Sequence, residues 1–569
     1  MNLASNPSIS GITVTGNGSN SLVLDSGNLT VDGFWNDPEI VYRLNGDVTV
    51  PAGRTLTIGA GQVVKARSFA GDDIFVDGTL IADGTPAARI IFTSDNDDTA
   101  GGDTDNNGPT GNFAGTRGSW DQIQFNATST GSVMDNIEVR FAGDLSFGGV
   151  VASIFVNGGG LTLINSTIRH SETTGVRVIG ANPTISGVEF QNNSGSAMSM
   201  NVASNPAVTD VSFLSNGLNG LNVEGGALAA STVWNDPAVV YRLFDDVTVP
   251  AGMTLTIAAG QIVKFRSFAG VDLVINGTLT ADATREQPVV FTSDNDDAAG
   301  GDTDNNGPTG NFAGSRGGWN SIRLGATSTA SVIDNAELRF AGDISFGGVA
   351  AAIISDGGST IVSNSVIRET ETHAIISRSD SSITATNNLI FRNSDTALRA
   401  ESGATLTATN NTINGNFRGA AADGAGTTLT LKNNLITRNT RSGVFASGGA
   451  TVAASFNTVF NPGAGGGDYE GLASQTGLNG NTSVDPKYFN ATNSQFQLRA
   501  GSTAIDSATG TGAPAADFLG NGRFDDPNTI NTGDGSTCLR SSSARPSWQA
   551  CRRPERPSSS KSPPPPRPI

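Results

Sequence analysis

Asparagine recurs at a fixed step of 23 residues in the region that follows residue 380. The step holds without exception for Asn388, Asn411, Asn434 and Asn457, and the apolar positions Ile390, Ile413, Ile436 and Val459 follow it too. Between these positions, apolar residues alternate with Thr, Ser and Asn, which is the period-2 pattern of a strand with one buried face. Each 23-residue unit is therefore predicted to contain at least two short strands separated by an asparagine turn.

One such unit is too small to bury its apolar face alone. Successive units must stack, with like residues above like, around a continuous interior. This stacking predicts an all-β fold, a parallel β-helix (solenoid) formed by a single chain. The turn asparagines are expected to form a ladder of side-chain amides from coil to coil, which assigns them a structural role and not a catalytic one. If each of the two large copies described below holds about eight coils and the C-terminal part a few more, a step of ~4.8 Å per coil gives a rod on the order of 90 Å long.

A second repeat, of 199 residues, covers most of the chain. The segment WNDP at Trp35 returns at Trp234, and GGDTDNNGPTGNFAG starting at Gly101 returns unchanged at Gly300. Near-identity over this span indicates a tandem duplication. The predicted organisation is copy one at residues 1–199 with an acidic loop at 94–119, copy two at 200–398 with an acidic loop at 293–318, regular 23-residue coils at 399–484, a β-helix-terminating segment at 485–536, and a tail at 537–569.

The tail differs in composition from everything before it. It is basic and rich in Pro, Ser and Arg, it holds both cysteines of the chain, Cys538 and Cys551, and it shows no strand alternation. We predict that it is disordered. A protein-coding frame that is lost near residue 537 would produce the same change in composition, and resequencing of the 3′ end distinguishes the two interpretations.

Charge and hydropathy limit the partners of the remaining chain. The formal net charge is −18, and the tail contributes +6 to it, so residues 1–536 carry about −24. Such a body repels nucleic acid and anionic membranes. No run of about 18 apolar residues occurs, so no transmembrane segment is expected. The first 30 residues lack the features of a signal peptide. Because Met1 corresponds to the interior Met200, we expect an upstream segment to be missing.

Several stretches carry a resemblance to a known family. VYRLNGDVTVPAGRTLTIGAGQVVK at residues 41–65, FVDGTLIADGTPAARIIFTS at 75–94 and NNLITRNTRSGVFA at 433–446 resemble the right-handed parallel β-helix, pectin-lyase-like repeat proteins that are common among bacterial secreted and surface proteins. The resemblance implies a right-handed solenoid and an extracellular or cell-surface location. The family includes polysaccharide lyases, hydrolases and adhesins, so the fold alone selects no function. Residues 485–506 resemble the closing segment of such surface proteins.

The acidic loops are the most informative candidates for a site, because function on a solenoid gathers in loops. Copy one carries Asp95, Asp97, Asp98, Asp103 and Asp105, copy two carries their equivalents, and no basic residue lies within either run. Crowded carboxylates repel one another, and a bound cation would relieve the repulsion.

The sequence DTDNNG in each loop matches the start of a calcium-binding loop, which places oxygen ligands at positions 1, 3 and 5 and glycine at position 6. The predicted calcium ligands are Asp103, Asp105 and Asn107 in copy one and Asp302, Asp304 and Asn306 in copy two. Position 12 is Ala114 or Ala313, where an EF-hand has a bidentate Glu, and no helices flank the loop. Asp95, Asp97 or Asp98 are candidates to complete the shell. The alternatives are a solvated acidic loop and a catalytic metal site.

Two functions are compatible with these features. The first is an extracellular β-helix that acts in adhesion or in binding of a polysaccharide or cell-surface glycan, with structural calcium in the loops. The second is a carbohydrate-active enzyme, either an acidic-polysaccharide lyase or a glycoside hydrolase. An enzyme would need an outward-facing groove of basic and acidic groups, for which the repeated candidates are Lys65, Arg67, Arg140 and Asp144 with Lys264, Arg266, Arg339 and Asp343.

The aromatic and histidine content adds little to the choice between these functions. Trp35, Trp120, Trp234 and Trp319 match between the copies and are expected to pack against loops or coils, with stacking on sugars as the alternative. His170 and His373 do not lie at the spacing of a metal pair. With two histidines and no thiol in residues 1–536, no catalytic triad is expected.

Overall fold

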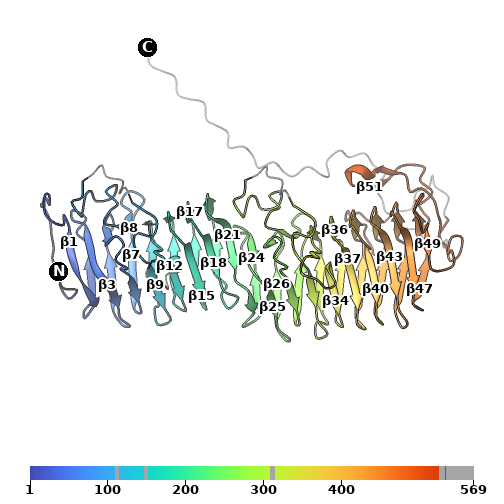
Figure 1. The fold of residues 1–569 in the computed structure, drawn as a ribbon, viewed down its shortest axis with the longest axis horizontal. Coiled ribbons are helices and arrows are strands. Elements are labelled where there is room, and N and C mark those ends of the chain that lie inside the picture. Colours follow the sequence, from blue (N-terminus) through green and yellow to red (C-terminus); the bar gives the residue numbers. More distant parts are fainter. Residues whose placement is uncertain (109–114, 147–151, 308–313, 524–531, 534–569) are drawn as a thin grey trace, which may run out of the picture.

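The protein is a long right-handed coil of parallel strands. The computed structural model describes residues 1–108, 115–146, 152–307, 314–523 and 532–533, and the predicted disordered tail at 537–569 lies outside these ranges. The described chain forms an all-β solenoid of about 19 turns, drawn out as a rod in Figure 1. The helical content of the described ranges is the single 3-10 turn η1 (Ala491–Asn493), which is far too short to cross a membrane.

A complete coil supplies three short strands, and away from the junction of the two copies each strand pairs in parallel with its equivalent in the next coil. We call the three stacks faces 1, 2 and 3. Face 1 consists of β2 (Gly33–Trp35), β4 (Thr55–Ile58), β7 (Thr79–Asp83), β10 (Ser132–Asp135), β13 (Leu161–Ile164), β16 (Thr184–Ser186), β19 (Ala207–Thr209), β23 (Thr232–Trp234), β26 (Thr254–Ile257), β29 (Thr278–Asp282), β32 (Ser331–Asp334), β35 (Ser359–Ser363), β38 (Ser382–Thr386), β41 (Thr405–Thr409), β44 (Thr428–Lys432) and β47 (Thr451–Ser455).

Face 2 consists of β6 (Ile74–Val76), β9 (Ile123–Asn126), β12 (Ala152–Asn157), β15 (Thr174–Ile179), β18 (Ser196–Met200), β22 (Gly226–Ala227), β25 (Val247–Val249), β28 (Leu273–Ile275), β31 (Ile322–Leu324), β34 (Ala351–Asp356), β37 (His373–Arg378), β40 (Leu398–Glu401), β43 (Arg418–Asp423), β46 (Ser442–Ser447) and β49 (Tyr469–Glu470).

Face 3 consists of β5 (Val63–Ala66), β8 (Ile90–Ser94), β11 (Ile137–Arg140), β14 (Thr167–Arg169), β17 (Glu189–Gln191), β20 (Ser212–Leu214), β24 (Tyr241–Leu243), β27 (Ile262–Phe265), β30 (Val289–Ser293), β33 (Ala336–Arg339), β36 (Val366–Arg368), β39 (Leu389–Phe391), β42 (Thr412–Asn414), β45 (Leu435–Thr437) and β48 (Thr458–Phe460). Three strands join faces 2 and 3: β1 (Leu22–Asn28), β3 (Tyr42–Val50) and β21 (Leu218–Val223).

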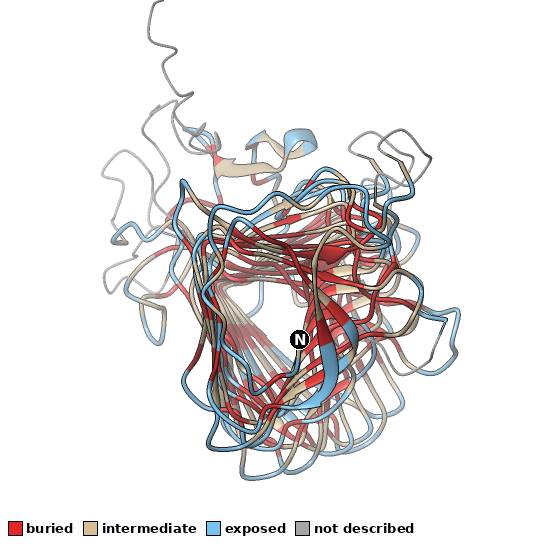
Figure 2. Ribbon diagram, turned by 90° about the vertical axis from the view of Figure 1, so that its left-hand side faces the viewer, coloured by how far each residue is buried: buried red, intermediate tan, exposed pale blue. Residues whose placement is uncertain are grey.

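The interior is one continuous apolar cluster that extends from Leu3 to Val459. Alternation along each strand sends apolar residues inward, as in β26, where Leu255 and Ile257 are buried and the alternating threonines are half-buried. Figure 2 looks along the rod and shows the coils superposed around this interior, with exposed residues concentrated at corners and loops. The four matched tryptophans are all buried, which confirms the expectation that they pack against the coils.

The predicted asparagine ladder is confirmed. The Nδ2 atom of Asn388 donates to Oδ1 of Asn411 at 3.0 Å, and the same bond continues through Asn434 and Asn457 to Asn481. Each of these side chains is buried. The left-handed backbone conformation belongs to the preceding residues, such as Asn387 and Asn410. The first of two adjacent asparagines therefore adopts the turn conformation, and the second forms the ladder.

A second ladder runs along the next corner and was not predicted. Its amides connect residues Asn393, Asn416, Asn439 and Asn461 with Nδ2 to Oδ1 distances of 2.9 to 3.2 Å. Both ladders satisfy buried backbone groups as well, because amide nitrogens such as those of Asn388 and Asn393 also bond to a carbonyl of the preceding coil. Each coil of this region is therefore fixed at two of its corners.

The two copies meet at a dislocation in the strand stacking. On face 1, β19 ends one sheet and β23 begins another, and no backbone pairing connects these two described strands. The sheet continues through β21, which pairs with β18 of face 2 on one side and with β24 of face 3 on the other. The stacking therefore shifts by one face where copy one meets copy two.

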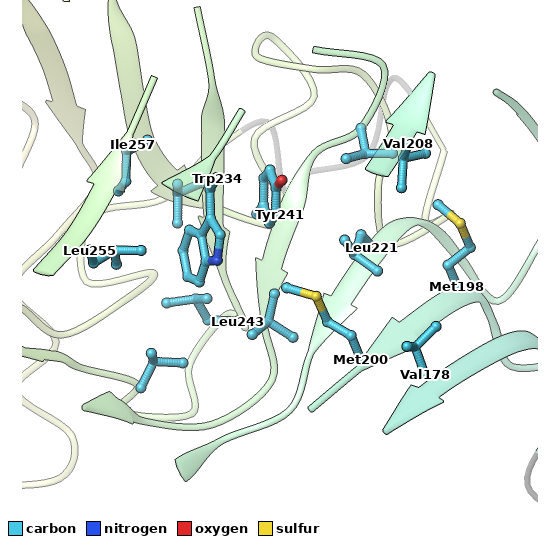
Figure 3. Packing of buried hydrophobic residues seen from close by; sticks show 14 of the residues in the cluster. Val178, Met198, Met200, Val208, Leu221, Trp234, Tyr241, Leu243, Leu255 and Ile257 are labelled. Carbon is cyan, nitrogen blue, oxygen red and sulfur yellow. The ribbon is translucent and has the colours of Figure 1, made fainter. Parts of the chain in front are cut away.

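The apolar interior bridges this dislocation without interruption. Figure 3 shows Met198 of copy one near Leu221, and Met200, the first residue of copy two, beside Leu243 and nearer to the Trp234–Tyr241 pair. The two rings stack with centroids 5.0 Å apart, and the Tyr241 hydroxyl donates to Asp236 at 2.7 Å. The duplicated halves thus share one core although their surface strands do not align.

Residues 485–523 leave the coil stack and return along its side. Their hairpin of β50 (Tyr488–Asn490) and β51 (Gln495–Leu498) is antiparallel. Tyr488 bonds to Thr437 at 3.1 Å, and Phe496 contacts Phe391. The segment that resembled a closing element therefore covers face 3 of the last coils.

Replacing the ladder residue Asn434 by Ala should destabilise the fold by about 3 kcal/mol, because buried donors and acceptors on Asn411, Asn457 and Ala408 lose their partner. Urea unfolding followed by circular dichroism measures the change. The control is Asn45→Ala, an exposed asparagine, which should alter stability by less than about 0.5 kcal/mol. Equal effects of the two substitutions would contradict a structural role for the ladder.

Candidate functional site

Each acidic loop leaves face 3 at the end of a strand, β8 in copy one and β30 in copy two, and is anchored on an earlier coil. In copy one, the Asn20 side chain donates to the carbonyl of Asp103 at 3.0 Å, and its backbone donates to Thr104 at 2.7 Å. Asn219 makes the same two contacts with the loop of copy two. The described parts of both loops therefore have equivalent positions on the coil surface.

Two of the five carboxylates in each loop are neutralised by basic residues from the coils. Arg43 pairs with Asp95 at 2.6 Å, and Arg140 pairs with Asp97 at 3.1 Å. In copy two, the equivalent ion pairs have distances of 2.7 and 2.9 Å. Although no basic residue lies within either run, two of the five carboxylates are thus neutralised, because residues distant in sequence supply the positive charge.

A buried lysine lies beneath each loop. Lys65 is fully buried and its ammonium donates to the carbonyls of Asp97 at 3.0 Å and Gly102 at 2.8 Å. Lys264 donates to Gly301 at 2.7 Å. Burial lowers the pKa of both lysines to about 8, and the neighbouring aspartates oppose this shift. These lysines attach the loops to the coils through backbone carbonyls.

The remaining three carboxylates converge. Asp98, Asp103 and Asp105 each place an oxygen within 4.8 Å of the others, and Asp297, Asp302 and Asp304 do the same in copy two. Burial raises the pKa of Asp98 and of Asp105, and repulsion by neighbouring carboxylates raises it further. Asp304 has its pKa raised to about 6 for the same reasons. Three residues were suggested to complete the calcium shell. Asp98 lies beside the predicted ligands Asp103 and Asp105, whereas Asp95 and Asp97 form ion pairs with arginines.

The loop backbone shapes this cluster in the same way in both copies. The amides of Asn107 and Gly108 donate to the two carboxylate oxygens of Asp103 at 3.1 and 3.0 Å. The Asn107 side chain donates to Asp105 at 2.9 Å, and Asn306 donates to Asp304 at 2.8 Å. Both predicted asparagines thus lie against the carboxylates. The position-12 residues Ala114 and Ala313 lie outside the described residues.

The candidate catalytic groove is not formed. Lys65 and Lys264 are fully buried, Arg140 and Arg339 are 6% and 8% exposed, and Asp144 and Asp343 are 1% exposed. Arg67 is held by Asp72 at 2.7 Å. Strand alternation had suggested outward-facing charges, but Arg140 and Arg339 form buried ion pairs with loop aspartates and the two lysines donate to loop carbonyls. Of the eight candidates, Arg266 is exposed.

A further group of acids, of which the sequence analysis singled out only Asp144, lies where face 3 turns into face 2 in copy one. Asp73, Asp121 and Asp144 are buried, and each has a carboxylate oxygen with no hydrogen-bond partner. Burial and neighbouring carboxylates raise the pKa of Asp73 to about 8 and of Asp121 to about 7. Copy two has Asn320 in place of Asp121, which removes one of these acids.

Substituting Asp121 with Asn, the residue of copy two, should stabilise the protein by about 2 kcal/mol at neutral pH. The native pKa of about 7 exceeds the unfolded value near 4, so ionisation of Asp121 lowers stability progressively as pH rises from about 4 to 7. The gain should therefore vanish near pH 4 and be complete above pH 7. Thermal melts across this range measure it, with the exposed Asp83→Asn as control. A gain independent of pH would contradict the assignment.

Comparison with known proteins identifies the fold and no activity. Residues 152–234 and 321–483 match the model of the right handed beta helix region. No curated protein matches the chain. Among solved structures, the catalytic unit of a thermostable GH87 alpha-1,3-glucanase from Streptomyces thermodiastaticus strain HF3-3 is 12% identical, with 83% of this chain and 70% of that chain covered and a TM-score of 0.26.

A catalytic domain of GH87 alpha-1,3-glucanase in complex with tetrasaccharides is also 12% identical, with 65% of this chain and 59% of that chain covered and a TM-score of 0.19. TM-scores this low carry no argument about activity. The family match and the stacked coils together confirm the fold that the resemblance implied: the chain contains right-handed parallel β-helix regions in both copies and in the coils that follow them.

Proposed function

We propose that this protein is an extracellular β-helix that binds calcium in two matched loops and uses its coil surface to bind a polysaccharide or cell-surface glycan. The single observation that carries the calcium proposal is the convergence of three carboxylates in each copy at positions 199 residues apart. Other parts of the duplicated sequence have diverged, whereas GGDTDNNGPTGNFAG is unchanged between the copies.

The chemistry of the cluster suits a hard cation. Calcium takes six to eight oxygen ligands, and carboxylates and amide carbonyls are among those it prefers. Asp98 and Asp297 each have a carboxylate oxygen without a hydrogen-bond partner, which leaves it available to an ion. Rotation of the Asn107 amide by half a turn would direct its oxygen toward the ion in place of its nitrogen. Asp103, Asp105 and Asn107 would then act together with Asp98.

The role of such an ion would be structural. The cluster lies in a loop that is already attached to the coils by Asn20 and Lys65. A cation would cancel the mutual repulsion of Asp98, Asp103 and Asp105, which no ion pair relieves among the described residues. Two similar copies would also present the same coil surface twice, so weak contacts with a repetitive polymer would gain effective concentration.

The alternative function, a carbohydrate-active enzyme, has one observation in its favour. Asp73 and Asp121 are neighbouring acids of raised pKa, and a general acid of a glycoside hydrolase needs such a pKa. Their burial argues against direct access of a substrate. Release of reducing ends from neutral polymers by the full chain, and its loss in Asp121→Asn, would establish this alternative.

Isothermal titration of the full chain with calcium should reveal two sites. Asp103→Asn should remove one site, and the further substitution Asp302→Asn should remove both, because each takes a charged ligand from one cluster. The melting temperature of the wild type should rise in calcium and fall in chelator, and that of the double variant should respond to neither. The exposed Asp282→Asn serves as the control and should keep both sites. Absence of binding, or retention of both sites in the double variant, would contradict calcium loops.

A further inference from the structure

The dislocation between the two copies opens a groove of about 830 Å³ on the side of the rod. Its walls come from both copies. Arg177, Ser196 and Ser199 belong to the last coils of copy one, and Glu224, Phe244, Asp245 and Asp246 belong to the first coils of copy two. Figure 1 places this region where β18, β21 and β24 follow one another. The volume lies within the range of about 300–1,000 Å³ that is typical of ligand sites.

Several of the residues that line the groove differ between the two copies. Copy one has Asn45 and Gly46 at the positions of Phe244 and Asp245, and Ser26 at the position of Gly225. Asp246 and Thr248 of the lining are unchanged from Asp47 and Thr49. The phenylalanine ring and the carboxylate of Asp245 are therefore absent from the equivalent positions of copy one.

A further difference between the copies positions Phe244, the aromatic side chain of the groove. In copy one, Arg67 is occupied by its ion pair with Asp72. Copy two has Val271 in place of Asp72, and Arg266 instead lies over the Phe244 ring, 4.7 Å from its centroid. The arginine holds the ring in place, yet 44% of Phe244 remains exposed. An exposed aromatic ring that is fixed in a groove provides an apolar surface for a ligand.

The polar lining is fixed as well. Arg177 reaches across the dislocation and makes two hydrogen bonds to Glu224, at 2.8 and 3.0 Å, so a side chain of copy one orients a carboxylate of copy two. Asp246 is held by the backbone amide of Asp272 at 2.7 Å. With three carboxylates and one guanidinium, the lining is net negative.

We propose that this groove binds a segment of a neutral polysaccharide. Sugar hydroxyls donate to the carboxylates of Glu224, Asp245 and Asp246 and accept from Arg177, while the C–H face of a pyranose ring packs on Phe244. The negative lining repels uronate polymers and so selects neutral ones. This inference rests on the polysaccharide binding proposed above, for which it names the site and the class of ligand.

Affinity electrophoresis of the full chain in gels that contain dextran, laminarin, galactomannan, polygalacturonate or alginate tests the groove. At least one of the three neutral polymers should retard the wild type, and neither anionic polymer should. Phe244→Asn, which installs the residue of copy one, should weaken the retardation at least tenfold. Phe34→Asn, a substitution of a similarly exposed phenylalanine on face 1, is the matched control and should leave retardation unchanged.

The outcomes separate the two proposals. If a neutral polymer retards the wild type and Phe244→Asn equally, the groove is not the binding site, and the polysaccharide binds elsewhere on the coils. If only anionic polymers retard the protein, the neutral specificity falls. If no polymer retards it, polysaccharide binding and the groove fall together. Thermal melts of both variants check that an effect does not reflect unfolding, since each side chain is exposed.

Discussion

The hydrogen bond between asparagine side chains of successive coils is the interaction on which the regular part of this rod depends. A buried amide that both donates and accepts along the solenoid axis fixes the spacing and the register of adjacent coils at once. Because two such ladders run along two corners, a coil cannot slip by one residue without leaving buried amides unpaired. Apolar residues then stack above apolar residues, and the single continuous core follows from that register.

Duplication of a solenoid segment produces two different surfaces. Within each copy the same side chains recur at the same depth, which is why the acidic loops have equivalent contacts with Asn20 and Asn219. Between the copies the last coil of one must meet the first coil of the other, and their strands do not align. The core continues across this point through Met198, Leu221 and Leu243, while the surface strands separate and leave the groove. The duplication thus generates a pair of matched acidic clusters and, at the junction of the copies, a groove lined by both of them.

Much of the fold could be predicted from spacing alone. The 23-residue step of Asn388 and its successors implied parallel stacking, the ladder and the approximate number of coils. The second ladder at Asn393 follows the same step through Asn416 and Asn439, but the last member, Asn461, comes after 22 residues, so the exact spacing does not continue. The dislocation could not be predicted, because it depends on which strand of copy two stacks on β18, and this is decided by packing in three dimensions.

The candidate site was predicted in part. Asp103 and Asp105 do converge, as their spacing in DTDNNG suggested, and Asp98 joins them. The partners of Asp95 and Asp97 could not be read from the loop, because Arg43 and Arg140 approach from strands 52 and 43 residues away. The same coil contacts bury Lys65, whose alternation in sequence had favoured an exposed position. Loop placement over the coils, and not strand periodicity, determines these environments.

Anomalous diffraction from crystals of the full chain soaked in terbium, a substitute for calcium, tests the paired loops most directly. The account predicts two strong peaks for each chain, one bounded by Asp98, Asp103 and Asp105 and the other by Asp297, Asp302 and Asp304. Peaks at other carboxylates, such as Asp73 and Asp121, with none at the two loops would contradict it.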